Sequence, residues 1–353
     1  MPIPFRSPFQ DAITRSAPKR VRFSVSALFA CWLLASITAE ASFEAGKFAL
    51  RSFSFEGQTR SYYVYAPTGY DGSSTALVVD IHGFGSNAGQ HSAISGFRNL
   101  ADSEGFLVTW PDGSSNAWNA GICCGAPMIL GTNDVGFLRE VVAQIGEEAA
   151  LDDERIYATG LSNGAAMSHR LACEAADLFA AVAPVAFPVP FDPMTQCEPS
   201  RPIPVAMVMG LSDEIVPYEP GFYPGAQESF EYWRDTNVCT GEIPDTTTPL
   251  AGEATCETYS NCEGGVATRL CSIVGSESAF GVALNHHVLY YNDSGYAVAS
   301  ESWNFMQGYR HPNPSQVPEP RASAMMLAAL AMMLAALASL VLLRTAARRR
   351  RTP

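Results

Sequence analysis

Gly160-Leu161-Ser162-Asn163-Gly164 is the stretch that decides the fold of this 353-residue chain. It follows the apolar run 155–159 and precedes the small-residue stretch 165–172, a pattern that predicts a strand, a sharp turn and a helix. A serine held at such a turn exposes its hydroxyl, and the next backbone N–H is free to face a developing oxyanion. The glycines are needed because a Cβ would collide where strand and helix approach each other. The stretch therefore predicts a nucleophile at Ser162.

The segments on either side of this turn alternate between predicted strands and predicted helices. Residues 51–67 alternate polar with aromatic or β-branched residues, which predicts a hairpin at a sheet edge, and 75–81 is a near-continuous apolar run typical of a buried parallel strand. Helices are predicted around 97–101 and 134–145, and further strands at 106–110, 155–159, 180–185, 203–209 and 266–274. Residues 236–263 are interpreted as a disulfide-bound excursion outside the core. This order predicts the α/β class, with a doubly wound, mostly parallel sheet covered by helices on both faces.

The two ends of the chain differ from this domain, which we place at 42–310. In residues 1–41, five basic residues precede an apolar stretch, and small residues follow at Ala39 and Ala41. This order predicts a secretory signal peptide, since about 15 apolar residues are short for a membrane span. Residues 322–343 are long and apolar enough for a transmembrane helix, and the basic segment 344–353 that follows predicts a cytoplasmic tail.

The linker at 311–321 contains Val317-Pro318-Glu319-Pro320, directly before the apolar segment. This motif, one apolar helix and a terminal arginine cluster resemble the PEP-CTERM sorting signal of Gram-negative bacteria. The resemblance implies an exosortase-like processing enzyme that cleaves near Pro320, in addition to signal peptidase at the N-terminus. Before processing, the C-terminal helix would hold the protein in the inner membrane. The expected location is the periplasm, the cell envelope or the exterior, and a plain anchor would leave the domain on the same side.

Charge and cysteine content narrow the class of the domain. The chain has a net charge of −13, and setting aside the ends (+3 for 1–41 and +6 for 321–353) leaves −22 for residues 42–320, which include the domain. Such a surface repels nucleic acid and favours a neutral or weakly charged substrate, although solubility also explains the acidity.

Eight cysteines remain once Cys31 leaves with the signal peptide, an even number that predicts disulfides in an oxidising compartment. Spacing suggests the pairs Cys173 with Cys197 and Cys239 with Cys262, and no metal site is expected because no Cys-x-x-Cys pair occurs.

A serine hydroxyl needs an imidazole to take its proton and a carboxylate to orient that imidazole. On this type of fold the order along the chain is serine, acid, histidine. Of the histidines after the turn, His311 lies in a proline-rich linker, so the base is His286 or His287, and only one of two neighbours in an extended segment can face Ser162.

The loop that leaves the strand at 203–209 contains the predicted acid. Asp213 is chosen over Glu214 of the same loop and over Asp245, which lies in the excursion. The predicted oxyanion donors are two backbone N–H groups, that of Asn163 after the nucleophile and that of Phe84 in the turn after the strand at 75–81.

With these residues assembled, the chain resembles the secreted polyhydroxybutyrate depolymerase and feruloyl esterase group of α/β hydrolases, which also contains acetyl xylan esterase relatives. The resemblance covers about residues 53–307. It rests on seven segments in order: RSYYVYAP (60–67), DIHG (80–83), WPDG (110–113), AWNAGICCG (117–125), NDVGF (133–137), YATGLSNG (157–164) and SDEIVPY (212–218). It implies an α/β-hydrolase fold with Ser162 as nucleophile, Asp213 as acid, and His82 to Phe84 at the border of the oxyanion hole.

One segment departs from the family pattern. Members of this group carry a glycine-rich approach to the catalytic histidine, often Gly-His-x-Trp-Pro, whereas this chain has GVALNHHVLY at 281–290. Aligning the aromatic residues that follow makes His287 the better candidate and leaves His286 as the alternative. Because the Trp-Pro of the family pattern is missing, the residues that form the rim of the substrate pocket are not assigned. The candidate substrate-binding residues are His82, Trp118 and Tyr218.

The sequence thus predicts an exported serine ester hydrolase that acts through an acyl-enzyme and needs no cofactor. The ester substrate would be a polyhydroxyalkanoate, a feruloylated or acetylated polysaccharide, or a short-chain ester, and a polymeric substrate is allowed. Two other hypotheses remain. In the first, the domain is a serine peptidase on the same fold. In the second, the altered histidine segment has cost the domain its catalytic activity, and it is a surface binding protein.

Overall fold

The structure is a computed structural model that describes residues 43–190, 197–241, 244–247, 254–274, 278–279, 282–283, 287, 290 and 296–312. The predicted signal peptide, transmembrane helix and basic tail lie outside the described residues, as do His286 and all of the linker after residue 312. Within the described ranges, every helix is too short or too polar to be a candidate membrane span.

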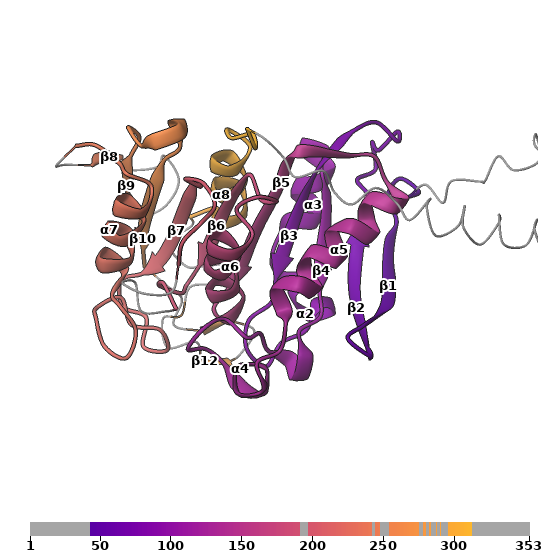
Figure 1. Cartoon of the computed structure of the whole chain (residues 1–353), viewed down its shortest axis with the longest axis horizontal. Helices are drawn as coiled ribbons and strands as arrows, with labels where there is room; N and C mark the ends of the chain where they lie inside the picture. Colours follow the sequence, from indigo (N-terminus) through magenta and orange to yellow (C-terminus); the bar gives the residue numbers. More distant parts are fainter. Residues whose placement is uncertain are drawn as a thin grey trace, which may run out of the picture. The chain divides into compact units, whose positions relative to one another are not determined.

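Ten strands of the described residues form one sheet in the order β1-β2-β4-β3-β5-β6-β7-β10-β9-β8, which runs from right to left in Figure 1. The six central strands, β4 to β10 in this order, are parallel, and the strands at both edges are antiparallel. The bounds are β1 Phe48–Phe55, β2 Gln58–Tyr65, β3 Thr75–Ile81, β4 Leu107–Pro111, β5 Leu151–Leu161, β6 Ala181–Val185, β7 Val205–Gly210, β8 Asp245–Thr247, β9 Ala254–Tyr259 and β10 Thr268–Ile273. A separate two-stranded piece joins β11 Ser278–Ala279 to β12 Val282–Ala283. The predicted mostly parallel sheet and its hairpin edge are confirmed.

Helices cover both faces of the sheet, and each face has its own core. Along β3, Leu77, Val79 and Ile81 belong to one cluster, and Ala76 and Val78 belong to the other, as the two-residue period of a strand requires. The first cluster includes α5, α6 and α7, and the second includes α2, α3 and α8. The helix bounds are α2 Ala88–Ile94, α3 Phe97–Glu104, α4 Gly125–Leu130, α5 Asp134–Glu148, α6 Asn163–Glu174, α7 Ala226–Thr236 and α8 Val298–Met306, with short 3₁₀ turns at η1 Ser114–Asn116 and η2 Glu263–Gly265.

Local signals explain where two of these helices begin and end. Helix α5 begins after Asn133, whose side-chain oxygen accepts the N–H of Gly136 at 3.0 Å and so satisfies a free amide of the first turn. Helix α3 ends at Gly105, which has a φ of +77°, a conformation that glycine adopts without steric cost. The start of α5 at Asp134 is the one that the sequence predicts.

The interpretation of residues 236–263 as an excursion outside the core is wrong in part. Strand β9 pairs with β10 and continues the sheet, and Ala254, Cys256 and Tyr259 are buried there. The predicted disulfides Cys173–Cys197 and Cys239–Cys262 are both present. Two further disulfides were not predicted: Cys256–Cys271, which joins a directly paired position of β9 and β10, and Cys123–Cys124, between neighbours in the chain.

Candidate active site

Ser162 lies between the end of β5 and the start of α6, with φ +55° and ψ −117°. This backbone conformation is strained for a residue with a side chain and is the one that a strand-to-helix nucleophile turn imposes. Its N–H donates to Val185 O at 2.8 Å, and its carbonyl accepts the N–H of Ala166 at 3.0 Å, so the turn is held from both sides. The side chain itself is half-buried and open to a small reactant.

The neighbouring glycines are required by the close approach of three backbone segments. A Cβ on Gly164 would lie 2.0 Å from Ile81 O, and a Cβ on Gly160 would lie 2.6 Å from Gly164 O. Real carbon atoms do not approach an oxygen so closely, so α6 can pack onto β3 and β5 only with glycine at these positions.

The turn after β3 lies beside the serine. A Cβ built on Gly83 would be 3.4 Å from Ser162 Cβ, so the two segments are in contact. Within the described residues, the N–H groups of Phe84 and Asn163 donate to no protein acceptor. Two such amides next to a half-buried serine are what binding of an oxyanion requires.

Asp213 and His287 form a buried pair. Asp213 follows β7, and its Oδ2 accepts a hydrogen bond from His287 Nδ1 at 2.7 Å, while its Oδ1 accepts the N–H groups of Ile215 and Val216 at 2.9 Å each. The carboxylate thereby fixes the imidazole with Nδ1 protonated, which leaves the Nε2 lone pair free to accept a proton. Both residues are less than a tenth exposed.

The structure thus pairs the predicted acid with one of the two predicted bases. Because β5 and β7 are both parallel to β6, Ser162 and Asp213 leave the same edge of the sheet. Among the described residues no hydrogen bond joins Ser162 Oγ to His287, so closure of the triad stays a prediction. Catalytic hydrogen bonds are often long in a free enzyme and shorten when substrate binds.

The side chains of His82 and Trp118 form hydrogen bonds that stabilise the turn after β3. Nδ1 of His82 donates to Gly83 O at 2.8 Å, and its Nε2 accepts the N–H of Gly113 at 2.9 Å. Burial lowers the pKa of His82 to about 4, so the ring is neutral at ordinary pH. Nε1–H of Trp118, which is fully buried, donates to His82 O at 2.9 Å. Both side chains therefore stabilise the turn through hydrogen bonds to its backbone. The substrate contacts expected of them stay predictions.

Tyr218, the third expected substrate-binding residue, is half-buried on the Asp213 side. Its hydroxyl lies 2.8 Å from Ser272 Oγ of β10 and accepts from Gln227 Nε2 at 3.1 Å. Substrate contact by Tyr218 also stays a prediction.

Sequence reasoning missed the role of the Asn163 side chain. Its Oδ1 accepts the N–H of Trp118 at 2.7 Å, and its Nδ2 donates to Trp118 O at 3.2 Å and contacts Cys123 Sγ at 3.5 Å. The nucleophile turn is thus clamped to the segment of the vicinal disulfide. A Cβ on Gly125, directly after that disulfide, would be 2.8 Å from a ring carbon of Phe84. The adjacent cysteines at 123–124 were the only signal that this segment has a special structure.

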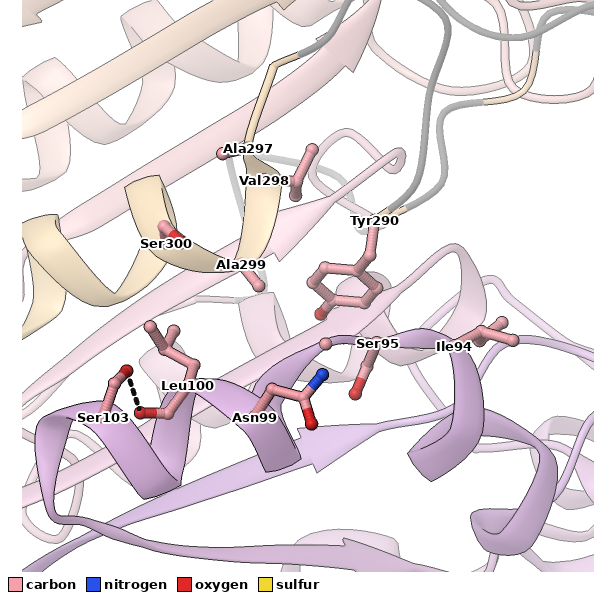
Figure 2. Close-up of a pocket in the computed structure, with 11 residues that line it drawn as sticks. Ile94, Ser95, Asn99, Leu100, Ser103, Tyr290, Ala297, Val298, Ala299 and Ser300 are labelled. Carbon is pink, nitrogen blue, oxygen red and sulfur yellow. Dashed lines mark hydrogen bonds between the residues drawn. The ribbon is translucent and has the colours of Figure 1, made fainter. Parts of the chain in front are cut away.

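A cavity among the described residues lies away from these groups. It has a volume of about 390 Å³ and lies between α3 and the start of α8, with Tyr290 as part of its wall (Figure 2). None of Ser162, Asp213 and His287 lines it.

Parts of this chain are similar to known proteins. Residues 60–191 match the family model described as esterase PHB depolymerase. Feruloyl esterase B of Piromyces equi is 35% identical over 239 residues, which cover 63% of this chain and 43% of that protein. Acetylxylan esterase of Coprinopsis cinerea is 30% identical over 200 residues, covering 53% of this chain and 52% of that protein. The chain therefore spans about half the length, or less, of these curated relatives.

A solved structure has a similar fold. Acetyl xylan esterase from Aspergillus awamori matches with a TM-score of 0.52 and 15% sequence identity, covering 73% of this chain and 99% of that one. At this identity the likeness concerns the fold alone. The fold is that of the α/β hydrolases, and residues 60–191, which hold Ser162 and both predicted oxyanion donors, match the esterase PHB depolymerase family.

Proposed function

We propose that this protein is an exported serine hydrolase of carboxylic esters. The observations that support the proposal are a serine on a strained turn after β5 and a buried, hydrogen-bonded Asp213–His287 pair after β7, both at the carboxyl ends of parallel strands. The match of residues 60–191 to an esterase family supports the same reaction class.

The reaction follows from the roles of these groups. Ser162 Oγ attacks the ester carbonyl carbon, and its proton passes to His287 Nε2. The oxyanion that forms is bound by the N–H groups of Phe84 and Asn163. When the C–O bond breaks, the alcohol leaves with the proton from His287, and a water molecule, deprotonated by the same nitrogen, then releases the acid and restores Ser162. Asp213 stabilises the imidazolium in both halves of the cycle.

The surroundings of the serine favour an uncharged, partly apolar substrate. Phe84, next to the oxyanion turn, is 62% exposed, and Ile122, before the vicinal disulfide, is 38% exposed. Exposed apolar side chains next to a reactive group suit apolar or aromatic acyl chains, and the charge of −22 on residues 42–320 opposes carboxylates. We therefore place feruloyl, acetyl and hydroxyalkanoyl esters of neutral alcohols or polysaccharides first among candidate substrates.

A fluorophosphonate probe tests the nucleophile directly. The wild type should gain the mass of one adduct, and Ser162→Ala should gain none and lose at least ~10³ of kcat on a short-chain aryl ester. Absence of an adduct on folded wild type would refute the esterase and favour a binding role. Hydrolysis of a peptide anilide faster than of the matched ester would favour a peptidase.

Export is part of the proposal and is supported by chemistry of the domain. Three disulfides join cysteines 15 to 24 residues apart, and such bonds persist in oxidising compartments. Signal peptidase and an exosortase-like enzyme are the proposed processing partners. The intact mass of the exported protein should correspond to an N-terminus at Ser42 and an end near Pro320, and an unprocessed mass would contradict this.

A further inference from the structure

The segment that carries His287 is attached to the sheet three residues further on, by Tyr290. The Tyr290 hydroxyl donates to Asp80 Oδ1 at 3.2 Å and lies 3.1 Å from Thr159 Oγ1. The residue is buried, and Figure 2 shows its ring pointing from the chain toward Ser95. The long side chain of Tyr290 thus reaches two strands in the centre of the sheet.

These two strands lead to the two other parts of the candidate active site. Asp80 lies on β3, three residues before Gly83 of the oxyanion turn, and Thr159 lies on β5, three residues before Ser162. Asp80 and Thr159 are also direct partners in the register of β3 and β5. One hydroxyl therefore connects the base segment to the supports of both the nucleophile and the oxyanion donors.

Asp80 is a fixed anchor for this hydroxyl. It is fully buried, its Oδ2 accepts Nε1–H of Trp110 at 2.7 Å, and its Oδ1 lies 2.8 Å from Nε2 of His91. Burial raises the pKa of Tyr290 well above its ordinary value, so the hydroxyl keeps its proton. That proton goes to the carboxylate, because hydrogen bonds to a charged acceptor are the stronger ones. Thr159 Oγ1 donates its own proton to Ala183 O at 2.6 Å, so its 3.1 Å approach to the Tyr290 oxygen is a close contact between the two hydroxyls.

Packing alone does not hold the ring at this depth. Phe97 and His91 contact it edge-on, with ring centroids 5.7 and 5.6 Å away. A further side is open to the cavity of about 390 Å³, whose walls also include Asn99, Val298 and Ala299 (Figure 2). Because a cavity supplies no contacts on that side, the hydroxyl contacts decide where the ring lies.

We propose that Tyr290 is a positioning residue for His287. Its contacts with β3 and β5 hold His287 in place relative to these two strands. Three residues span at most about 10 Å of extended chain, so fixing Tyr290 limits where the imidazole can lie. Asp213 fixes the orientation of the imidazole through Nδ1, and Tyr290 limits how far the backbone next to His287 can move. This inference rests on the proposed function, since it takes His287 as the base.

Tyr290→Phe in the full chain tests the proposal, because it removes only the hydroxyl. Tyr157→Phe is the matched control: Tyr157 is a buried tyrosine of β5 whose hydroxyl donates to Tyr309 O at 2.9 Å, away from Asp80. On a short-chain aryl ester, with rates referred to folded protein, Tyr290→Phe should lower kcat about tenfold and leave KM within about twofold. Tyr157→Phe should change both by less than about twofold.

The second measurement is the low-field proton resonance of the His287 Nδ1–H bonded to Asp213, observed in protein with ¹⁵N-labelled histidine. We expect this signal in the wild type and in Tyr157→Phe, and its loss or broadening in Tyr290→Phe. Equal kcat values in the two tyrosine variants, together with an intact resonance in Tyr290→Phe, would overturn the positioning role.

The two proposals fail in different ways. If the wild type hydrolyses no ester, or if Ser162→Ala keeps the wild-type rate, the proposed function is wrong. The resonance does not depend on turnover, so an unchanged signal in Tyr290→Phe would then still refute the positioning role, and a lost signal would still support it.

Discussion

At the scale of single residues, the proposed mechanism depends most on whether His286 or His287 is the catalytic base. His287→Ala should lower kcat by at least ~10³, because no other group would take the serine proton, whereas His286→Ala should leave kcat within about threefold. Steady-state kinetics on one aryl ester compares the two variants directly. If His286→Ala were the inactive one, the Asp213–His287 pair would be structural and the base would be its neighbour.

The site shows which residues a sequence can reveal. Ser162 and Asp213 could be predicted because each lies in a short local pattern, a glycine-flanked turn and the loop after a strand. The base could not be fixed in the same way, because no local sequence pattern tells which of two adjacent histidines faces the carboxylate. The contacts of His82 and Trp118 were also out of reach, since they join the turn after β3 to residues about 30 positions away.

Two buried neutral histidines should make stability fall in acid. His169, whose Nδ1 accepts from Trp233 Nε1–H at 3.0 Å and whose Nε2–H donates to Phe187 O at 3.2 Å, has its pKa lowered by burial to about 3, and the pKa of His82 is about 4. An unfolded histidine titrates near 6.5, so the unfolded state binds more protons once the pH falls below that value. The free energy of unfolding should therefore be highest above pH 6.5 and decrease toward pH 4.

By pH 4.5 each of these histidines should lower the free energy of unfolding by on the order of 2 kcal/mol, as measured by urea denaturation. His169→Gln is the test variant, because an amide can donate to Phe187 O and accept from Trp233 without taking up a proton. It should lose less stability than the wild type between pH 7 and pH 4.5. The same loss in both proteins would mean that His169 does not contribute to the pH dependence.

At the scale of elements, parallel strands were easier to predict than the antiparallel edge. Strands such as β3 are buried on both faces and appear as unbroken apolar runs, and the predicted bounds 75–81 agree with those found. In strand β9 only Ala254, Cys256 and Tyr259 are buried. The polar residues between them obscure the alternation of apolar and polar residues by which a strand is predicted from sequence. Its place in the sheet depends on pairing with β10, a contact that no local pattern records.

The disulfide between β9 and β10 should stabilise this edge. Cys256 and Cys271 are 15 residues apart, and a cross-link over such a loop contributes about 3 kcal/mol by limiting the unfolded chain. The variant Cys256→Ala/Cys271→Ala should lose stability of this order in urea denaturation, with activity on a short ester within about twofold at 25 °C. Activity should persist because β6, β7 and β10 separate β9 from β5. A large loss of activity in the folded variant would show that the edge supports the site.

At the scale of the whole molecule, the charge separates the domain from the two ends. Residues 42–320 carry a net charge of −22, whereas the ends are positive. Several buried or half-buried acids are paired with arginine, such as Asp134 with Arg60 at 3.0 Å and Glu148 with Arg51 at 2.8 Å. Acidic residues outnumber basic ones by 33 to 11 over residues 42–320, so most of this negative charge is not neutralised within the segment and creates a negative potential around it.

This potential should discriminate between esters by their charge. A neutral aryl ester should show the same kcat/KM at 10 mM and 200 mM salt, whereas an ester of similar size with a carboxylate should react more slowly at low salt and gain severalfold as salt increases. The reason is that the screening length falls from about 30 Å at 0.01 M to about 8 Å at 0.15 M, so repulsion at a distance is removed while contacts in the site remain. Initial rates of both esters at four salt concentrations decide the question. If the anionic ester were fastest at low salt, a local positive group at the site would outweigh the domain charge, and the preference for neutral substrates would be wrong.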